Sequence, residues 1–147
     1  MKLVVKFKKL HEFAKIPQKQ TDGAAGMDLS ARLDKSVVID PGERVLVPTD
    51  LAMELPAGHV ALVFPRSGIA SKNGVTLANC VGVIDEDYRG NVQASMINLS
   101  RRPFVVDDGM RIAQMLVIKL ADVDAKEATE LSDTARGDGG FGSTKGC

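Results

Sequence analysis

Residues 44–56 read RVLVPTDLAMELP and residues 59–65 read HVALVFP, and these two stretches indicate the fold class. Apolar side chains fall largely on alternate positions in both stretches, which is the pattern of half-buried strands. The intervening Pro56-Ala57-Gly58 is typical of a turn. The alternating residues are Val45, Val47, Leu51, Met53, Leu55, Val60, Leu62 and Phe64. We therefore predict short consecutive strands joined by turns.

Similar segments rich in Val, Ile and Leu recur along the chain, separated by clusters of Pro, Gly, Asp and Asn. Only residues 67–75, SGIASKNGV, favour a short helical turn, and the polar residues 122–131 show no clear pattern. Many short strands with spaced turns predict an all-β fold with little helix, built as a sandwich, a jelly roll or a distorted β-barrel.

The composition changes after about Leu131, where the sequence SDTARGDGGFGSTKGC offers mainly Gly and small polar residues. Such a segment has almost nothing to bury. The whole chain of 147 residues suits one domain with its own core. We therefore predict a single β domain over residues 1–131 and a flexible, Gly-rich C-terminal arm over residues 132–147.

Charge and cysteine use exclude several classes of function. Lys plus Arg and Asp plus Glu both number 19, so no net field would draw the chain to nucleic acid or to a membrane surface. No apolar stretch approaches the roughly 20 residues that a membrane span requires. Cys80 and Cys147 are far apart and form no disulfide framework. We expect a cytoplasmic protein with neither a nucleic-acid nor a membrane partner.

Residues 82–92, GVIDEDYRGNV, have the pattern of a strand, a tight polar turn and a second strand, and Asp85 stands where the first apolar run ends. A carboxylate that is partly buried there would keep enough basicity to take a proton from water, as a general base must. Tyr88, the only tyrosine, could then be a platform for a sugar or a base. The alternative is structural, because hairpin turns also favour Asp and Gly, and a ring can cap a sheet edge.

Two further segments suggest contacts with an anion. Arg66-Ser67-Gly68 follows an apolar strand, and an arginine beside a hydroxyl and backbone amides suits a phosphate group, although an ordinary turn is the alternative. Gln114 lies inside residues 111–118, RIAQMLVI, which are apolar on both faces. Its amide should therefore be buried, with hydrogen-bond partners either in the core or on a ligand.

The arm also contains groups that suit a nucleotide. Its glycines allow backbone amides to approach a phosphate, Arg136 offers a bidentate cation, and Phe141 can stack on a flat base. Ser143 and Thr144 add two hydroxyl groups. The alternative is a disordered chain end without a role in binding.

Taken in order, five of these segments resemble the five motifs of the trimeric dUTP diphosphatases, and together they span residues 25–144. The segments are Ala25-Gly26-Met27-Asp28-Leu29, Pro65-Arg66-Ser67-Gly68, Gly82-Val83-Ile84-Asp85 through Tyr88-Arg89-Gly90, Arg111-Ile112-Ala113-Gln114, and Arg136-Gly137 through Thr144. The resemblance implies a homotrimer of distorted jelly rolls. Each of its three active sites would use several subunits and be closed by a neighbour's C-terminal arm. The implied reaction is hydrolysis of dUTP to dUMP and pyrophosphate, which removes dUTP and supplies dUMP as a dTMP precursor.

The resemblance also implies roles for single residues. Asp85 would be the general base that activates the water attacking the α-phosphorus. Tyr88 would pack under the deoxyribose and leave no room for a ribose 2′-hydroxyl. Asn79 and the backbone near Gln93 would read the uracil edge, beside a tight hairpin wall that excludes the methyl group of thymine. Asp28 would hold waters around Mg2+, the implied cofactor, without touching the ion itself.

Further substrate contacts are implied in the third motif, at the phosphates and in the arm. They are Gly82 and Ile84, then Arg66, Ser67, Gly68 and Gln114, and finally Arg136, Phe141, Gly142, Ser143 and Thr144. Two residues depart from the family's pattern. Lys145 stands where another glycine is expected, and Cys80 lies beside the uracil reader. We expect Cys80 to be a small buried hydrophobe, because neither histidine lies near it in sequence to activate it as a nucleophile.

Two rival functions fit fewer of these residues. dCTP deaminases resemble this family in fold, but they use a glutamate at the place that Ser95 occupies here, and a serine is a poor proton shuttle. Release of ammonia from dCTP would identify that activity. The other rival is a β module that binds a nucleotide or a protein partner as a regulator, which would bind dUTP and release no pyrophosphate.

Overall fold

The computed structural model describes residues 3–141, which contain eleven β-strands and one short helix. In chain order the elements are β1 (Lys6–Lys9), β2 (Met27–Ser30), β3 (Val37–Ile39), β4 (Arg44–Pro48), β5 (Leu51–Glu54), β6 (His59–Pro65), α1 (Ser67–Asn73), β7 (Val75–Leu77), β8 (Gly82–Ile84), β9 (Gln93–Asn98), β10 (Phe104–Val106) and β11 (Arg111–Lys119). The prediction of an all-β fold with little helix is confirmed, and the predicted helical turn is α1.

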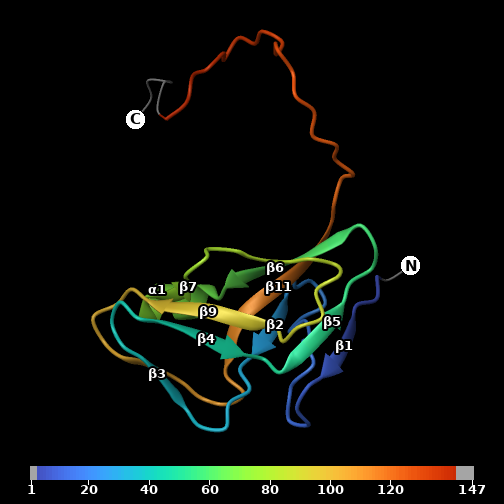
Figure 1. Cartoon of the computed structure of the whole chain (residues 1–147). Helices are drawn as coiled ribbons and strands as arrows, with labels where there is room; N and C mark the ends of the chain where they lie inside the picture. Colours follow the sequence, from blue (N-terminus) through green and yellow to red (C-terminus); the bar gives the residue numbers. More distant parts are fainter. Residues whose placement is uncertain (1–2, 142–147) are drawn as a thin grey trace.

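Two larger sheets enclose the core. One has the order β2-β11-β6-β8 and the other the order β4-β9-β7, while β1 pairs with β5 and β3 with β10. Figure 1 shows β4 and β9 in front of β2 and β11 as two layers. Within residues 3–141 the four sheets stay open and do not close into a barrel.

The core lies between these layers and takes side chains from both. Leu29 and Met115 come from the first sheet and Val47 and Met96 from the second, and all four belong to one cluster of buried residues. Burying such side chains stabilises the fold by about 1.5–3 kcal/mol each relative to leaving them in water. Of the alternating residues that predicted the strands, Val47, Met53 and Leu55 belong to this core cluster and Val45 packs against it. On β6 the prediction is wrong in detail, because Ala61 and Val63 enter the core cluster and Leu62 and Phe64 do not.

The predicted hairpin at residues 82–92 is wrong. β8 pairs with β6, where Ile84 lies opposite Ala61, whereas β9 pairs with β4 and β7 in the other sheet. β4 pairs along β9 from Gln93 to Ile97, and β7 pairs with its second half from Met96 to Asn98, whereas β8 extends the other sheet by pairing with β6. Residues 85–92 therefore cross from one sheet to the other, and β8 and β9 diverge beside this crossing.

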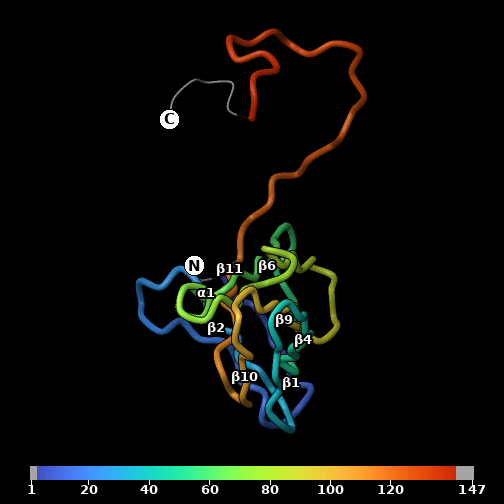
Figure 2. The backbone as a smooth tube through the Cα atoms, turned by 90° about the vertical axis from the view of Figure 1, so that its left-hand side faces the viewer, coloured from blue at the N-terminus to red at the C-terminus, as the bar shows by residue number. Residues whose placement is uncertain are grey.

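The last strand ends at Lys119, and residues 120–141 form neither strand nor helix. The Leu120 N–H still donates a 2.8 Å hydrogen bond to the Gly58 carbonyl oxygen. Beyond it the chain leaves the body and extends into the surroundings (Figures 1 and 2). No helix within residues 3–141 is long and apolar enough to cross a membrane.

Candidate active site

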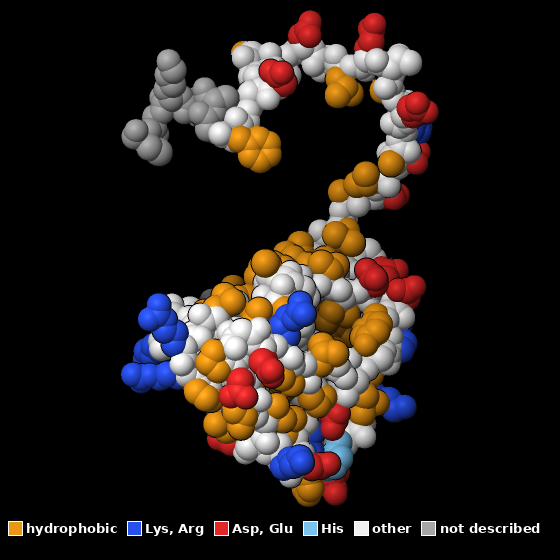
Figure 3. Space-filling view, turned by 60° about the vertical axis from the view of Figure 1, so that its left-hand side comes forward, with side chains coloured by type: hydrophobic (Ala, Val, Ile, Leu, Met, Phe, Trp, Pro, Cys, Tyr) orange, Lys and Arg blue, Asp and Glu red, His pale blue; other side chains and the backbone are white. Residues whose placement is uncertain are grey.

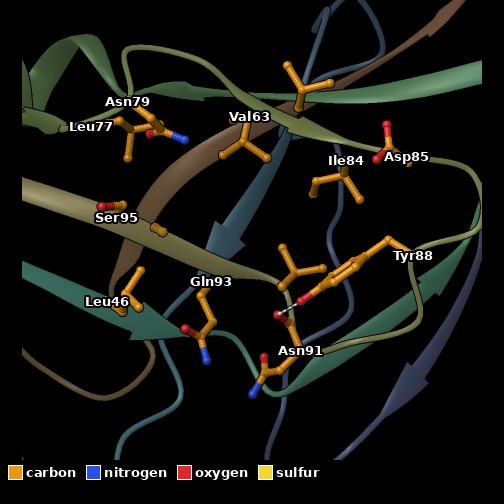
Figure 4. Close-up of a pocket in the computed structure, with 14 residues that line it drawn as sticks. Leu46, Val63, Leu77, Asn79, Ile84, Asp85, Tyr88, Asn91, Gln93 and Ser95 are labelled. Carbon is orange, nitrogen blue, oxygen red and sulfur yellow. Dashed lines mark hydrogen bonds between the residues drawn. The ribbon is translucent and has the colours of Figure 1, made fainter.

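A pocket of about 310 Å³ opens where β8 and β9 diverge. Six of the residues predicted to bind or convert the substrate line it, and they are Asn79, Gly82, Ile84, Asp85, Tyr88 and Gln93. Figure 4 shows Asp85 and Tyr88 at one end of the pocket and Asn79 at the other, with Gln93 and Ser95 on the opposite wall. The third motif and its neighbours therefore build one concave site.

Asp85 is exposed, which corrects the expectation that the strands partly bury it. It is the first residue after β8, and the polar residues that follow it in the crossing loop also face solvent. It is the only acidic residue that lines the pocket in the described part of the chain. Any shielding of this carboxylate from water must come from a ligand or from another copy of the chain.

The ring of Tyr88 is held at the pocket by its own loop. The Tyr88 hydroxyl donates a 3.0 Å hydrogen bond to the Asn91 carbonyl oxygen, and a Cβ built on Gly90 would lie 2.6 Å from Tyr88 Cζ. No real side chain tolerates such a distance. Glycine at position 90 therefore allows the ring to lie directly against the backbone.

For the platform role that the family resemblance implies for Tyr88, we predict that Gly90→Ala displaces the ring and weakens binding of a deoxyribonucleotide by about 2–10-fold, because aromatic contacts of this kind contribute about 0.5–1.5 kcal/mol. Isothermal titration with a non-hydrolysable dUTP analogue measures the loss. The matched control is Gly23→Ala, since a Cβ on Gly23 meets no atom within 4 Å. If Gly90→Ala, Gly23→Ala and the unchanged protein bound the dUTP analogue equally well, Gly90 would not be needed to hold the Tyr88 ring in its binding position.

Several hydrogen bonds fix the crossing loop that carries Asp85 and Tyr88. Arg89 donates from Nη1 to the Glu86 carbonyl oxygen at 2.6 Å, and the Glu86 carboxylate accepts from the Gly58 N–H. Asn91 donates from Nδ2 to Asp50 Oδ1 at 2.7 Å. The loop is therefore attached to the body at both ends, which positions the pocket side chains before any ligand arrives.

Cys80 is exposed, so the expectation of a buried hydrophobe is wrong. It lies in the turn after β7 and has a φ of 62°, a left-handed conformation that places its side chain outside the core. Its N–H donates to the Leu77 carbonyl oxygen at 3.1 Å, which closes the turn. The neighbouring Asn79 is thereby directed to the pocket while Cys80 is not part of its lining.

A second group of predicted residues gathers at the other end of β6, around Asp28. Arg66 follows β6 directly, and its Nε lies 3.2 Å from Asp28 Oδ1. Gln114 pairs in register with Asp28 and donates from Nε2 to the Pro65 carbonyl oxygen at 3.0 Å. Gln114 is half-buried, less than its apolar surroundings led us to expect, and its partner is the backbone.

Ser67 and Gly68 are exposed in the first turn of α1, next to Arg66. A hydroxyl, a guanidinium and backbone N–H groups thus stand together at the end of β6, which is the chemistry that holds phosphate oxygens. This phosphate-type group, formed by Asp28, Arg66, Ser67, Gly68 and Gln114, shares no lining residue with the pocket at Asp85.

The two groups are separated along β6. Asp85 follows Ile84, which lies opposite Ala61 near the start of β6, whereas Arg66 follows its last residue. At about 3.3 Å per residue, the six residues from position 60 to position 66 span roughly 20 Å. We call the pocket at Asp85 and the phosphate-type group the two half-sites of the chain. Within one chain they are too far apart to hold neighbouring phosphates of one nucleotide.

Asp28 suits an outer role at a metal rather than direct binding. Both of its oxygens already lie beside guanidinium groups: Oδ1 is 3.2 Å from Arg66 Nε in an ion pair, and Oδ2 accepts a 3.0 Å hydrogen bond from Arg111 Nη1. A carboxylate has further lone pairs for water, and Mg2+ commonly keeps several waters and takes its other ligands from phosphates. Among residues 3–141 no group of three or more His, Cys, Asp or Glu could hold an ion alone. The residues fit an ion that arrives with a polyphosphate.

The arm residues contact only each other within the described range. Arg136 donates from Nε to the Gly139 carbonyl oxygen at 2.9 Å, and Phe141 is fully exposed. Gly142, Ser143, Thr144 and Lys145 lie outside the described residues. Among the described arm residues, none lines the pocket at Asp85 or hydrogen-bonds to the phosphate-type group.

Sequence reasoning missed Arg111 beside Asp28 and eight of the residues that line the pocket, Ser95 and Asn91 among them. Arg111 binds Asp28. Ser95 lines the pocket, although the sequence analysis used it only as an argument against a deaminase. A signal for Arg111 was present in the sequence, because it opens the segment RIAQ that contains Gln114. Its contact with Asp28 depends on a register shift that the sequence pattern did not indicate.

Comparison with known proteins agrees with this arrangement. The protein-family model for dUTPase matches residues 12–145. Deoxyuridine 5'-triphosphate nucleotidohydrolase of Hydrogenobaculum sp. is 52% identical over 98% of both chains, and that of Rickettsia bellii is 50% identical over 95% of this chain and 94% of its own. The structure of a Staphylococcus bacteriophage 80alpha dUTPase mutant with dUpNHpp has a TM-score of 0.86 at 26% identity, covering 95% of this chain and 97% of the phage chain.

The family match extends over the body and over most of the arm, from residue 12 to residue 145. The structural match also supports the jelly-roll-like form of the open sheets. The chain therefore belongs to the dUTPase family and is a hydrolase.

Proposed function

We propose that the chain hydrolyses dUTP to dUMP and pyrophosphate. The observation that carries this proposal is the pocket whose lining holds one carboxylate, Asp85, beside the platform of Tyr88 and the amides of Asn79 and Gln93. The names of the relatives at about 50% identity support the same substrate and reaction. Location in the cytoplasm stays a prediction that depends on cysteine use.

Asp85 acts as the general base in the proposed reaction. Its carboxylate takes a proton from a water molecule, and the water oxygen attacks the α-phosphorus in line with the bond to the leaving oxygen. That bond breaks and its electron pair leaves with pyrophosphate. Exposure of Asp85 in the single chain leaves room for both the water and the α-phosphate beside it.

The pocket walls account for the choice of base and sugar. The amides of Asn79 and Gln93 can each donate and accept, so they suit the carbonyl and N–H groups on the edge of uracil. A base with another edge would leave these groups unpaired, which costs about 1–3 kcal/mol for each buried group. Tyr88 lies under the sugar and excludes a 2′-hydroxyl by contact.

Separation of the half-sites supports a site shared between copies. We propose a homotrimer in which Asp85 of one chain faces the phosphate-type group of a neighbour. The body of each subunit, which ends near Leu120, binds the nucleotide, and residues 132–147 form an arm that closes a neighbour's site. Phe141 stacks on the base, while Arg136, Ser143 and Thr144 bind phosphate oxygens.

We propose Mg2+ as the cofactor, bound together with the triphosphate. When bound, it would offset the charge that builds on the phosphate oxygens. Asp28 would orient waters around it, while Arg66, Ser67 and Gln114 bind the phosphates directly. The two guanidinium groups hold the Asp28 carboxylate in place for this outer role.

Deamination of dCTP finds no support in the pocket. Ser95, at the place where a deaminase would have its glutamate, lines the wall from β9. Its hydroxyl is a poor proton shuttle at neutral pH. The remaining carboxylate, Asp85, is at the sugar end of the pocket, on the opposite side from Asn79 (Figure 4).

The test of the proposed function is pyrophosphate release from dUTP, UTP, dTTP and dCTP, each with Mg2+ and with the ion removed by EDTA. We predict turnover of dUTP alone, and a loss of at least about 10-fold without the ion. Ammonia release from dCTP is measured alongside. Tight binding of dUTP without pyrophosphate would instead identify a regulatory module, and efficient turnover of UTP or dTTP would contradict the assigned pocket.

A further inference from the structure

We propose that Arg111 is a positioning residue for the phosphate end of the active site, and that a β-bulge in β11 is what places it there. This inference rests on the proposed hydrolysis of dUTP and extends it. Arg111 was outside the set of site residues that the sequence predicted. The assignment depends on its contacts with Asp28 and Arg66.

The Asp28 carboxylate lies between two guanidinium groups. Its Oδ1 is 3.2 Å from Arg66 Nε and its Oδ2 is 3.0 Å from Arg111 Nη1. The Asp28 side chain is only 14% exposed, whereas that of Arg111 is 46% exposed. Arg66 also donates from Nη1 to the Arg111 carbonyl oxygen at 3.1 Å. Arg111 therefore holds Asp28 by its side chain and Arg66 by its backbone.

A bulge in β11 makes this arrangement possible. In a regular strand, residues three positions apart face opposite sides of the sheet, so Arg111 and Gln114 would be separated. Here Arg111 lies opposite Ser30 and Gln114 opposite Asp28, with a register shift between Arg111 and Ala113. Ser30 and Asp28 share one face of β2, and so Arg111 and Gln114 share that face too. Bulges commonly redirect side chains in this way beside functional sites.

The burial of the bulged residues agrees with this geometry. Ile112 and Ala113 are consecutive in sequence and are both buried, at 1% and 0% exposure. Two consecutive residues on the core side are what an extra residue in the strand produces. In the segment RIAQ, Arg111 and Gln114 therefore face the phosphate-type group, whereas Ile112 and Ala113 face the core.

The charges indicate what Arg111 does for the substrate. One carboxylate shared between two guanidinium groups leaves the three side chains with a net positive charge, which suits a polyphosphate. Without Arg111, Asp28 is free to pair with Arg66 alone, in the bidentate geometry that such pairs favour. That pairing would neutralise Arg66 and withdraw its donors from the phosphates. Arg111 thus leaves the Arg66 donors free for the phosphates and holds the Asp28 carboxylate in place.

A merely structural salt bridge is the competing explanation, and ligand binding separates the two. The test compares Arg111→Met, the conservative Arg111→Lys and the control Arg101→Met. Arg101 is an exposed arginine in the loop between β9 and β10, outside both half-sites. Titration calorimetry with dUpNHpp and Mg2+ gives Kd, pyrophosphate release gives KM and kcat, and circular dichroism gives the midpoint of thermal unfolding.

We expect Arg111→Met to raise Kd and KM by about 10–100-fold, the usual effect of losing a partner that orients a site group. Arg111→Lys should lie between this variant and the unchanged protein, because lysine keeps the charge but lacks the planar guanidinium fork. Arg101→Met should bind as the unchanged protein does. A lowered thermal midpoint with unaltered Kd in Arg111→Met would overturn the proposal and leave a structural salt bridge.

The outcomes distinguish this inference from the proposed function. If the unchanged protein releases no pyrophosphate from dUTP, the proposed function fails, and the Kd values still decide the role of Arg111. If Arg111→Met does not fold, Arg111→Lys decides alone. A Kd raised several-fold by that variant supports the assignment, and an unchanged Kd overturns it.

Discussion

Replacing Asp85 by Asn is expected to lower kcat for dUTP hydrolysis by about 10²–10⁴-fold, the usual contribution of a general base. The amide has the size and shape of the carboxylate, but it cannot accept the proton of the attacking water. Because Asp85 is exposed and only lines the pocket, the fold loses no packing. Steady-state pyrophosphate release measures kcat, and titration with dUpNHpp should show that the variant still binds.

The matched control is Asp87→Asn, which removes an exposed carboxylate from the same loop. Asp87 lies two residues beyond Asp85 and is not part of the pocket lining. Its activity should stay within about twofold of the unchanged protein, since a surface charge away from the reacting atoms contributes little. If Asp87→Asn lost activity and Asp85→Asn kept it, the general base would have to be reassigned.

Local sequence patterns predicted where the strands lie better than which of their side chains are buried, since Leu51–Met53 in β5 and both Val60 and Ala61 in β6 are buried in succession. Alternation in residues 44–65 corresponds to β4, β5 and β6, and the polar SGIASKN segment to α1. The same patterns could not say which strands pair. GVIDEDYRGNV has the appearance of a hairpin, but only its first three residues form a strand, β8, which pairs with β6, while the next strand, β9, pairs with β4 and β7 in the other sheet.

The site was predictable to the extent that motifs specify chemistry. Six residues expected to bind or convert the substrate line one pocket, and the phosphate-type residues gather at another place. Burial was less predictable, since Asp85 and Cys80 both lie in turns whose direction depends on backbone conformation. Arg111 was missed because a bulge, invisible in the apolar pattern of RIAQMLVI, turns it toward Asp28.

The two half-sites lead to the second large prediction. Asp85 and Arg66 stand at opposite ends of β6, roughly 20 Å apart by strand geometry. In the proposed reaction, water held by Asp85 attacks an α-phosphorus whose neighbouring phosphates are held near Arg66, and a triphosphate is too short to span that distance. A working site therefore needs Asp85 from one copy of the chain and Arg66 from another.

Co-expression of Asp85→Asn with Arg66→Met should consequently restore activity that neither variant has alone. A site formed between two copies is intact when the copy that supplies Asp85 carries only the Arg66→Met change and the copy that supplies Arg66 carries only the Asp85→Asn change. With random mixing of equal amounts, each copy is the required variant with a probability of about one half. About one quarter of the sites in a symmetric assembly is therefore intact. Differently tagged chains allow the mixed assemblies to be isolated before pyrophosphate release is measured.

The control uses two changes within one half-site, Arg66→Met with Gln114→Met, both of which affect the phosphate-type group. Every site in that mixture receives one damaged phosphate end, so no intact site forms and the mixture should stay near the activity of the variants themselves. If Asp85 and Arg66 instead served one site within a single chain, Asp85→Asn mixed with Arg66→Met would restore nothing. Recovery in the first mixture and no recovery in the second would show that one active site takes Asp85 from one copy of the chain and Arg66 from a neighbouring copy.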